Sequence, residues 1–207
     1  WFSLIKRPGE VKQEISGYYA GEISDEYLQP VNIGIDICTY RREPYVLRNL
    51  MQLKEKILDN EQLDAAAHIR IYVIDNGKTL KEHAEICELV KKSDGRICIL
   101  EDRNAGGVGG FTRGMMEVMN HREEYGMTHV LLMDDDAVIE PDAVMRTYGL
   151  LATRKEEWKK ITVGGGILRQ EFPHILFCAG DKWKDGFVIS PRKNLDVRDY
   201  QTACCSY

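Results

Sequence analysis

Three consecutive carboxylates, Asp134, Asp135 and Asp136, are the residues whose types and spacing most directly predict chemistry in this sequence. They follow an apolar run at 130–133 that is typical of a strand buried on both faces. Because side chains alternate along a strand, we expect Asp134 and Asp136 to point one way and Asp135 the other. Adjacent like charges favour a cation, and Mg²⁺ usually binds one or two carboxylates together with substrate phosphates. The alternative is a solvated acidic turn before a helix that starts near Pro141.

A glycine-rich segment at 104–114 joins a predicted strand to a predicted helix. Glycines let the backbone approach a ligand closely, and the N–H groups at a helix N-terminus favour anions, so phosphate is the expected ligand. The segment is not a P-loop, because no Gly-Lys-Ser/Thr follows, and Thr112 stands where a dinucleotide fingerprint has its third glycine. Arg113 can add a positive charge for a diphosphate. The alternatives are a connector that permits tight packing and an arginine exposed to solvent.

Composition and charge exclude several classes of protein. The chain has 207 residues, of which 43% are apolar and 29% are charged, and this suits one globular α/β domain. The net charge is −5 and the basic residues are scattered, so we expect no nucleic-acid partner. No apolar run reaches the roughly 20 residues of a membrane span. The six cysteines form no CxxC pair, and we expect reduced thiols in a cytoplasmic protein.

The pattern of predicted elements changes near residue 30. Residues 1–30 are predicted to contain a β-hairpin, the remnant of an upstream β domain, and a connector. Beyond them, strands are expected at 31–38, 68–75, 96–101, 128–133 and 161–166, with short segments near 175–177 and 187–189. Helices are expected at 44–59, 79–92, 109–125 and 142–153. This alternation predicts an α/β fold with a mostly parallel sheet flanked by helices, and ligands bind such sheets at the carboxyl ends of the strands.

The methionines of the predicted helix at 109–125 have a structural interpretation. Met115, Met116 and Met119 recur with Phe111 and Val118 at helical spacing, which predicts core packing rather than a cofactor site.

Four motifs, in this order, resemble the family-2 glycosyltransferases with the Rossmann-like GT-A fold. They are Thr39-Tyr40-Arg41-Arg42, Asp75-Asn76-Gly77, the glycine segment at 104–114, and Asp134-Asp135-Asp136. The sequence is most similar to the bacterial galactofuranosyltransferases of cell-wall galactan synthesis and to their rhamnosyl relatives, over about residues 31–190. The resemblance implies that residues 1–30 are the tail of a β-sandwich domain plus a connector. It also implies that residues 31–207 are a truncated GT-A catalytic domain that binds a nucleotide sugar.

The resemblance implies roles for individual residues. Asp134 and Asp136 match the DXD positions that hold Mn²⁺ or Mg²⁺ against the donor diphosphate, and Asp135 lies nearer to the donor sugar. Arg41 contacts the nucleotide, and Asp75 faces the uracil or the ribose. The complete set of expected donor-binding residues is Thr39, Arg41, Asp75, Asn104, Gly106, Gly107, Arg113, Asp134 and Asp135.

Two further features follow from the resemblance. Gly164-Gly165-Gly166 matches a small-residue strand end near the sugar pocket, for which a bulge or close packing is an equal alternative. The general base and the histidine that completes the metal shell are expected beyond residue 207, so the catalytic residue stays unknown and the chain alone is expected to lack a complete active site.

The expected function is inverting glycosyl transfer from a UDP-sugar, with UDP-galactofuranose as the donor, to extend a cell-surface polysaccharide. A divalent metal neutralises the charge that accumulates on the leaving diphosphate. The expected partners are the donor and a glycan or glycolipid acceptor. Homo-oligomerisation stays open, as does a peripheral location at the inner face of the plasma membrane through regions outside this chain.

Three alternative functions stay open at this point. The first is transfer of rhamnose or another sugar by a family-2 enzyme. The second is a sugar nucleotidyltransferase, which needs a glycine-rich loop after the first strand, whereas Thr39-Tyr40-Arg41-Arg42 contains no glycine. The third is a non-catalytic module that binds nucleotides or sugars.

Overall fold

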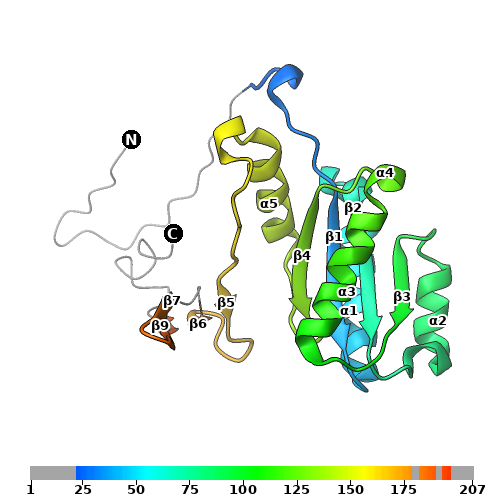
Figure 1. Ribbon diagram of the computed structural model, residues 1–207. Helices are drawn as coiled ribbons and strands as arrows, with labels where there is room; N and C mark the ends of the chain where they lie inside the picture. Colours follow the sequence, from blue (N-terminus) through cyan, green and yellow to red (C-terminus); the bar gives the residue numbers. More distant parts are fainter. Residues whose placement is uncertain (1–21, 179–181, 190–192, 197–207) are drawn as a thin grey trace, which may run out of the picture.

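The computed structural model describes residues 22–178, 182–189 and 193–196 of the chain. Its centre is a four-stranded parallel sheet with the strand order β3-β2-β1-β4 (Figure 1). The strands are β1 (Ile33–Thr39), β2 (Ile69–Asp75), β3 (Ile97–Glu101) and β4 (His129–Asp134). The predicted α/β class and the predicted parallel sheet are therefore confirmed. Because the strands are parallel, their carboxyl ends meet at one end of the sheet.

Helices cover both faces of this sheet. They are α1 (Glu43–Leu53), α2 (Ala84–Lys91), α3 (Gly106–Asn120), α4 (Arg122–Tyr125) and α5 (Pro141–Thr153). A π-helical turn, η2 (Lys54–Leu58), continues α1. Short 3₁₀ turns are η1 (Asp25–Tyr27), η3 (Asp64–His68), η4 (Leu80–Glu82) and η5 (Glu156–Trp158). None of the helices in the described parts of the chain is long and apolar enough to cross a bilayer.

The main hydrophobic core lies between the sheet and α1, α2 and α5. β1 contributes Ile33, Ile35 and Ile37, which point to the same face because alternate side chains of a strand do so. In α1, Val46, Leu50 and Leu53 are buried at the spacing of one helical face. Each of these large apolar side chains stabilises the fold by roughly 1.5–3 kcal/mol relative to an exposed position. A smaller cluster of Tyr72, Val118 and Met127 lies on the α3 side.

The boundaries of α3 differ from the prediction. The helix was expected from residue 109 to residue 125, but it begins at Gly106 and ends at Asn120, and α4 follows after His121. The glycines at 106–110 therefore form the first turns of the helix rather than a loop. Gly126, which has a φ of 61°, ends α4 in a left-handed conformation that glycine adopts without strain.

The strand β4 is not buried on both faces, as the apolar run had indicated. Val130 and Leu132 are 38% and 51% exposed, whereas Met133, on the side of α5, is buried. β4 forms an edge of the sheet, and α3 makes most of its contacts with β1 and β2. The same partial cover leaves Met116 and Met119 of α3 exposed, so the prediction that they belong to the core is wrong.

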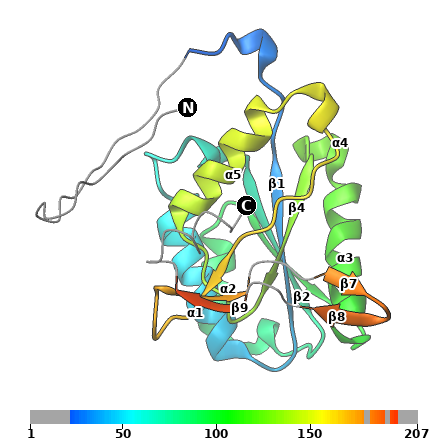
Figure 2. The ribbon, with the colours of Figure 1, turned by 90° about the vertical axis from the view of Figure 1, so that its left-hand side faces the viewer.

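The chain after α5 forms short antiparallel strands (Figure 2). One sheet contains β5 (Ile167–Leu168), β6 (Ile175–Cys178) and β9 (Lys193–Asp196), and a hairpin contains β7 (Lys182–Lys184) and β8 (Phe187–Ile189). The predicted strand at 161–166 is absent, and residues 164–166 of this segment are three exposed glycines, which lack side chains to pack a strand. The hairpin predicted within 1–30 falls mainly on residues 1–21, outside the described residues.

A buried carboxylic acid lies between the sheet and α3. Asp36 is fully buried, and neither of its carboxylate oxygens has a hydrogen-bond partner in the structure. Tyr72, its neighbour on β2, also has a buried hydroxyl without a partner. Burial raises the pKa of Asp36 from 3.8 to about 7, because the charged form loses its hydration. The acid is therefore neutral in the folded chain at mildly acidic pH.

We predict that Asp36→Asn stabilises the fold in a pH-dependent way. Between about pH 4 and pH 7 the unfolded chain releases a proton that the folded chain retains, so the acid progressively lowers stability as the pH rises. The substitution should raise the free energy of unfolding at pH 8 by up to about 4 kcal/mol, and hardly at all at pH 4. Urea unfolding at both pH values measures this. Asp64→Asn, an exposed control, should show no such difference. A benefit of Asp36→Asn that does not vary with pH would contradict the raised pKa.

Candidate functional site

A cleft of about 530 Å³ lies at the carboxyl ends of β1, β2 and β4, beside the start of α3. This is the place where a parallel α/β sheet usually binds its ligand. Twelve residues line it, and they come from the ends of strands, the acidic triplet and the glycine segment. They are Cys38, Thr39, Tyr40, Arg42, Asn76, Asn104, Gly106, Gly107, Phe111, Asp134, Asp135 and Asp136.

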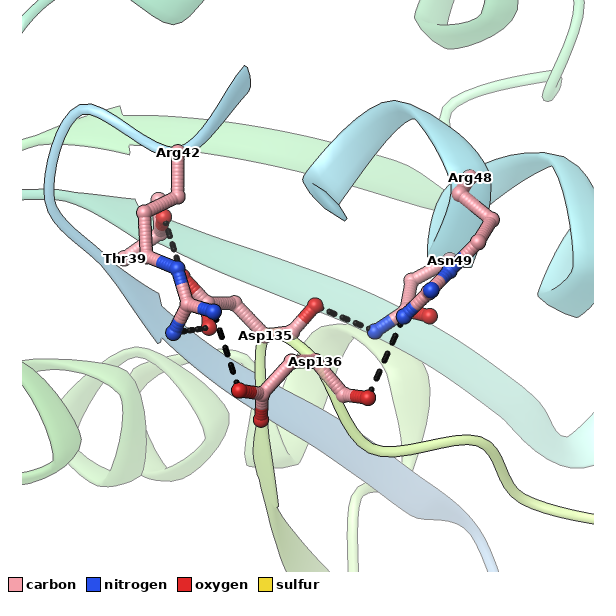
Figure 3. A network of polar contacts seen from close by, with 6 residues as sticks. All are labelled: Thr39, Arg42, Arg48, Asn49, Asp135 and Asp136. Atoms are coloured by element: carbon pink, nitrogen blue, oxygen red, sulfur yellow. Dashed lines mark hydrogen bonds and ion pairs between the residues drawn. The ribbon is translucent and has the colours of Figure 1, made fainter. Parts of the chain in front are cut away.

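The acidic triplet spans the end of β4 and the turn that follows it. β4 ends at Asp134, and the next two residues form a turn. Asp134 and Asp136 are exposed and Asp135 is buried, which agrees with the expectation that Asp135 points away from its two neighbours. Asp135 is only 5% exposed, and its Oδ2 accepts a hydrogen bond of 2.7 Å from Thr39 Oγ1. Asp135 and Asp136 share a partner in Arg42, which lies beside both (Figure 3). The three carboxylates therefore have three different environments.

Arg42 forms the central ion pair of the cleft. Its Nη1 donates to Asp135 Oδ1 at 2.8 Å, and its Nη2 donates to Asp136 Oδ2 at 2.9 Å. The guanidinium also lies 4.2 Å from the centre of the Tyr45 ring, which is a cation–π contact. The hydrogen bond to Asp136 and the charges of both carboxylates raise the pKa of Arg42, so it stays charged at every accessible pH.

The helix α1 holds the backbone of the acidic turn. Asn49 Nδ2 donates to the carbonyl of Asp135 at 2.5 Å, and Arg48 Nη2 donates to the carbonyl of Asp136 at 3.2 Å (Figure 3). Asn49 is almost fully buried, so the amide exchanges no hydrogen bonds with solvent. Because α1 packs on the core through its apolar face, these contacts connect the turn to the hydrophobic core.

The opposite wall of the cleft is the N-terminus of α3. Asn104 Oδ1 accepts a hydrogen bond from the backbone N–H of Gly106 at 3.1 Å, and Asn76 Nδ2 donates to the carbonyl of Gly106 at 3.4 Å. Gly106 has a φ of 71°, which favours glycine at this position. The first N–H groups of an α-helix lack partners within the helix and attract anions. Gly107 adds no side chain that would block this approach.

Two further glycines let α3 lie directly on β1. A Cβ added to Gly110 would lie 2.1 Å from Cys38 Sγ, and one added to Gly114 would lie 1.9 Å from Asp36 Oδ1. Both distances are far below any van der Waals contact. Burial, followed by the charges of Asp36 and Asp135, raises the pKa of Cys38, so this thiol is protonated and unreactive at neutral pH.

We predict that Gly110→Ala destabilises the fold by about 1–3 kcal/mol, because the added methyl group forces α3 away from β1. The matched control is Gly149→Ala in α5, where an added Cβ meets no atom within 4 Å. That control should stabilise the helix by up to about 1 kcal/mol, since alanine favours helices over glycine. Chemical denaturation of both variants measures the difference. Equal effects of the two substitutions would show that the contact between α3 and β1 is not close.

Three residues predicted to bind the donor do not line the cleft. Asp75 is fully buried, and its two oxygens accept hydrogen bonds from the backbone N–H groups of Gly77 at 3.0 Å and Leu80 at 2.8 Å, so its carboxylate holds the turn after β2. Arg41 has a φ of 52°, and its guanidinium carbon lies 5.3 Å from the centre of the Tyr40 ring. Arg113 pairs with Glu117 along α3. The glycines at 164–166 likewise do not belong to the cleft.

The cleft also contains residues that were not predicted as site residues. Cys38, Tyr40, Arg42, Asn76 and Phe111 all line it. Asn76 and Arg42 stand within motifs recognised in the sequence, but the neighbours Asp75 and Arg41 were chosen instead. For Asp75 and Asn76 the available signal is that an aspartate at the end of a strand commonly accepts hydrogen bonds from the turn that follows, as Asp75 does here.

Two carboxylates of the cleft can provide part of the ligand set of a divalent cation such as Mg²⁺ or Mn²⁺. The described residues contain no group of three or more histidine, cysteine or acidic side chains placed to hold a metal. Asp134 and Asp136 nevertheless line the same cleft and are exposed to it. Two carboxylates completed by phosphate oxygens are an ordinary ligand set for Mg²⁺, so the residues fit a metal that enters together with a diphosphate.

Known proteins similar to this chain include two curated relatives. Over 182 residues the chain is 28% identical to galactofuranosyltransferase GlfT2 of Mycolicibacterium smegmatis, covering 87% of this chain and 26% of the relative. Over 151 residues it is 27% identical to the GlfT2 of Mycobacterium tuberculosis, covering 72% and 22%. The chain therefore spans about a quarter of the length of these relatives.

Two solved structures are similar in part. TarS residues 1–349 from S. aureus matches with a TM-score of 0.42 and 14% identity, over 58% of this chain and 32% of that one. The mannosyltransferase PcManGT from Pyrobaculum calidifontis, in complex with GDP-Man and Mn²⁺, matches with a TM-score of 0.46 and 13% identity, over 72% and 39%.

The family assignment follows from the sequence itself. The model of the family "Glycosyl transferase family 2" matches residues 35–175, which include most of β1, all of β2 to β4 and every residue that lines the cleft. The chain therefore belongs to glycosyl transferase family 2.

Proposed function

We propose that this chain binds the donor in an inverting, metal-dependent glycosyltransferase that uses a UDP-sugar, with UDP-galactofuranose as the donor. The observation that carries the proposal is that one cleft brings together the acidic triplet and the N-terminus of α3. One wall suits a divalent cation and the other suits phosphate oxygens. A nucleotide diphosphate with its metal is the ligand that needs both at once.

In this proposal the exposed carboxylates Asp134 and Asp136 hold the metal. When bound, the metal supplies charge neutralisation for the diphosphate as it leaves the sugar. The buried Asp135 does not bind the metal, since its oxygens are already used by Thr39 and Arg42. It keeps the turn in place through these hydrogen bonds, and in this proposal it lies nearer to the donor sugar than the metal does.

The other wall binds the diphosphate. The N–H groups of the first turn of α3, apart from that of Gly106, donate hydrogen bonds to phosphate oxygens, and Gly107 places no side chain between them. Asn104 shapes this helix start through its hydrogen bond to Gly106 N–H. Thr39 acts through Asp135 rather than by contact with the donor. Arg41, Asp75 and Arg113 do not line the cleft, so this proposal gives them no contact with the donor.

The donor sugar is inferred from the relatives. Both curated relatives are galactofuranosyltransferases, at 27–28% identity, and this supports a galactofuranosyl donor. The glycan or glycolipid acceptor in cell-surface polysaccharide synthesis is part of the proposal and rests on the resemblance alone. The acceptor hydroxyl needs a general base. We assign no described residue to that role, because the carboxylates of the cleft are committed to the metal and to Arg42.

We predict that Asp136→Ala abolishes the metal dependence of UDP binding, because it removes one of the two exposed carboxylates that hold the metal. Calorimetric titration of UDP with and without Mn²⁺ measures the effect. The unaltered chain should bind UDP at least about tenfold more tightly with Mn²⁺, and Asp136→Ala should not. Asp142→Ala, which removes an exposed carboxylate that pairs with Arg146, should behave like the unaltered chain. Equal Mn²⁺-dependent affinities for Asp136→Ala and the unaltered chain would overturn the metal assignment.

We further predict selectivity for the furanose form of the donor. With Mn²⁺ present, UDP-galactofuranose should bind more tightly than UDP-galactopyranose or a rhamnosyl nucleotide, as measured by competition against UDP. The two galactosyl donors differ only in ring form, so they are a matched pair. A preference for the rhamnosyl nucleotide would favour a rhamnosyltransferase, and metal-independent binding of all donors would favour a non-catalytic module.

A further inference from the structure

Arg42 supplies the positive charge that contacts the acidic turn. Its guanidinium contacts Asp135 and Asp136 at once, at 2.8 and 2.9 Å (Figure 3). The side chains of Arg42 and Asp136 are 39% and 48% exposed, whereas that of Asp135 is 6% exposed. Arg42 therefore pairs with one buried carboxylate, that of Asp135, and with one accessible carboxylate, that of Asp136.

The two halves of this interaction should differ in strength. An ion pair exposed to solvent is weak, because water and salt screen it. A charge-assisted hydrogen bond to a buried carboxylate is stronger, and breaking it leaves a buried charge without compensation. Arg42 should therefore release Asp136 easily while it retains Asp135.

If Arg42 released Asp136, its guanidinium would still have a second contact besides Asp135. Arg42 also contacts the Tyr45 ring, and Arg42 itself lines the cleft. A guanidinium on an aromatic ring keeps part of its stabilisation when an ion pair breaks. The Nη2 group that leaves Asp136 can then donate to an oxygen of a phosphate in the same cleft.

We propose that Arg42 is an internal counter-ion that competes with the divalent metal for Asp136 and couples metal binding to nucleotide binding. In the empty cleft, the guanidinium neutralises the turn and weakens binding of the metal alone. When a diphosphate enters with the metal, Arg42 moves from Asp136 to a phosphate oxygen, and the metal takes the free carboxylate. This inference rests on the proposed function, because it concerns the metal and diphosphate of that cleft.

The test measures Mn²⁺ binding by calorimetry, with and without UDP, and does not depend on catalysis. Arg42→Met removes the charge and keeps an unbranched side chain. It should bind Mn²⁺ alone about fivefold more tightly than the unaltered chain, which is the ratio expected for loss of a partly exposed competing ion pair. It should also show a smaller increase of Mn²⁺ affinity when UDP is added, because the residue that responds to the diphosphate is gone.

Arg41→Met is the matched control. It removes the same charge one residue away, but Arg41 lies against Tyr40 and does not contact the carboxylates. Its Mn²⁺ affinity without UDP should stay within about twofold of the unaltered chain, since exposed charges beyond contact distance are screened. Arg42→Lys is a second variant in case Arg42→Met does not fold, which circular dichroism will show. A single ammonium cannot span both carboxylates, so its Mn²⁺ affinity should be intermediate.

Two results overturn the inference and differ from failure of the proposed function. If Arg42→Met binds Mn²⁺ alone no more tightly than the unaltered chain, Arg42 does not compete with the metal. If Arg41→Met gains as much affinity as Arg42→Met, the effect is one of net charge. In both cases, Mn²⁺-dependent UDP binding that is lost in Asp136→Ala would leave the proposed function intact. Absence of Mn²⁺ binding in every chain, with UDP present, would overturn both.

Discussion

The buried carboxylate of Asp135 is the constraint on which the cleft depends. A charge that is 5% exposed must be compensated, since an unpaired buried charge costs several kcal/mol. Thr39 from β1 and Arg42 from the following turn supply the partners of its oxygens, and Asn49 from α1 holds its carbonyl. Three separate parts of the chain thus converge on one residue. Its exposed neighbours are held by contacts on either side: Asp134 pairs with Cys38 as the last residue of β4, and the carbonyl of Asp136 accepts a hydrogen bond from Arg48 of α1.

Both walls of the cleft are located by the last two residues of β1. Thr39 faces the α1 side of the sheet and binds the acidic turn, whereas Cys38 faces α3 and touches the position of Gly110. Neighbouring residues of a strand point to opposite faces. The end of β1 therefore positions the acidic turn on one face of the sheet and the start of α3 on the other. The distance between the carboxylates and the N-terminus of α3 is therefore a property of the strand, and it does not rely on a flexible loop.

The sequence predicted the sheet well because its signals are local. Alternation of apolar strands with amphipathic helices requires no knowledge of distant contacts, and the four parallel strands lie within about two residues of their predicted ends. The exposure of β4 and of Met116 and Met119 was not predictable from the sequence, since it depends on which elements cover the edge of the sheet. The choice of Arg41 over Arg42 failed to match the cleft for a similar reason. Both residues follow the same strand, and only the turn geometry, with Arg41 at a φ of 52°, decides which guanidinium reaches the acids.

The two faces of the sheet divide stability from function. The face under α1, α2 and α5 is apolar and continuous, and it supplies most of the buried hydrophobic area. The face under α3 holds a buried acid and a buried phenol without hydrogen-bond partners, beside glycines that replace side chains. Such local departures from ideal packing concentrate where a protein needs a particular geometry. Here the geometry gained is the close approach of α3 to β1, which brings an anion-binding helix start to the same strand end as the acidic turn. The unpartnered polar groups on the α3 face lower stability. The fold withstands this cost because the apolar face under α1, α2 and α5 would become exposed on unfolding.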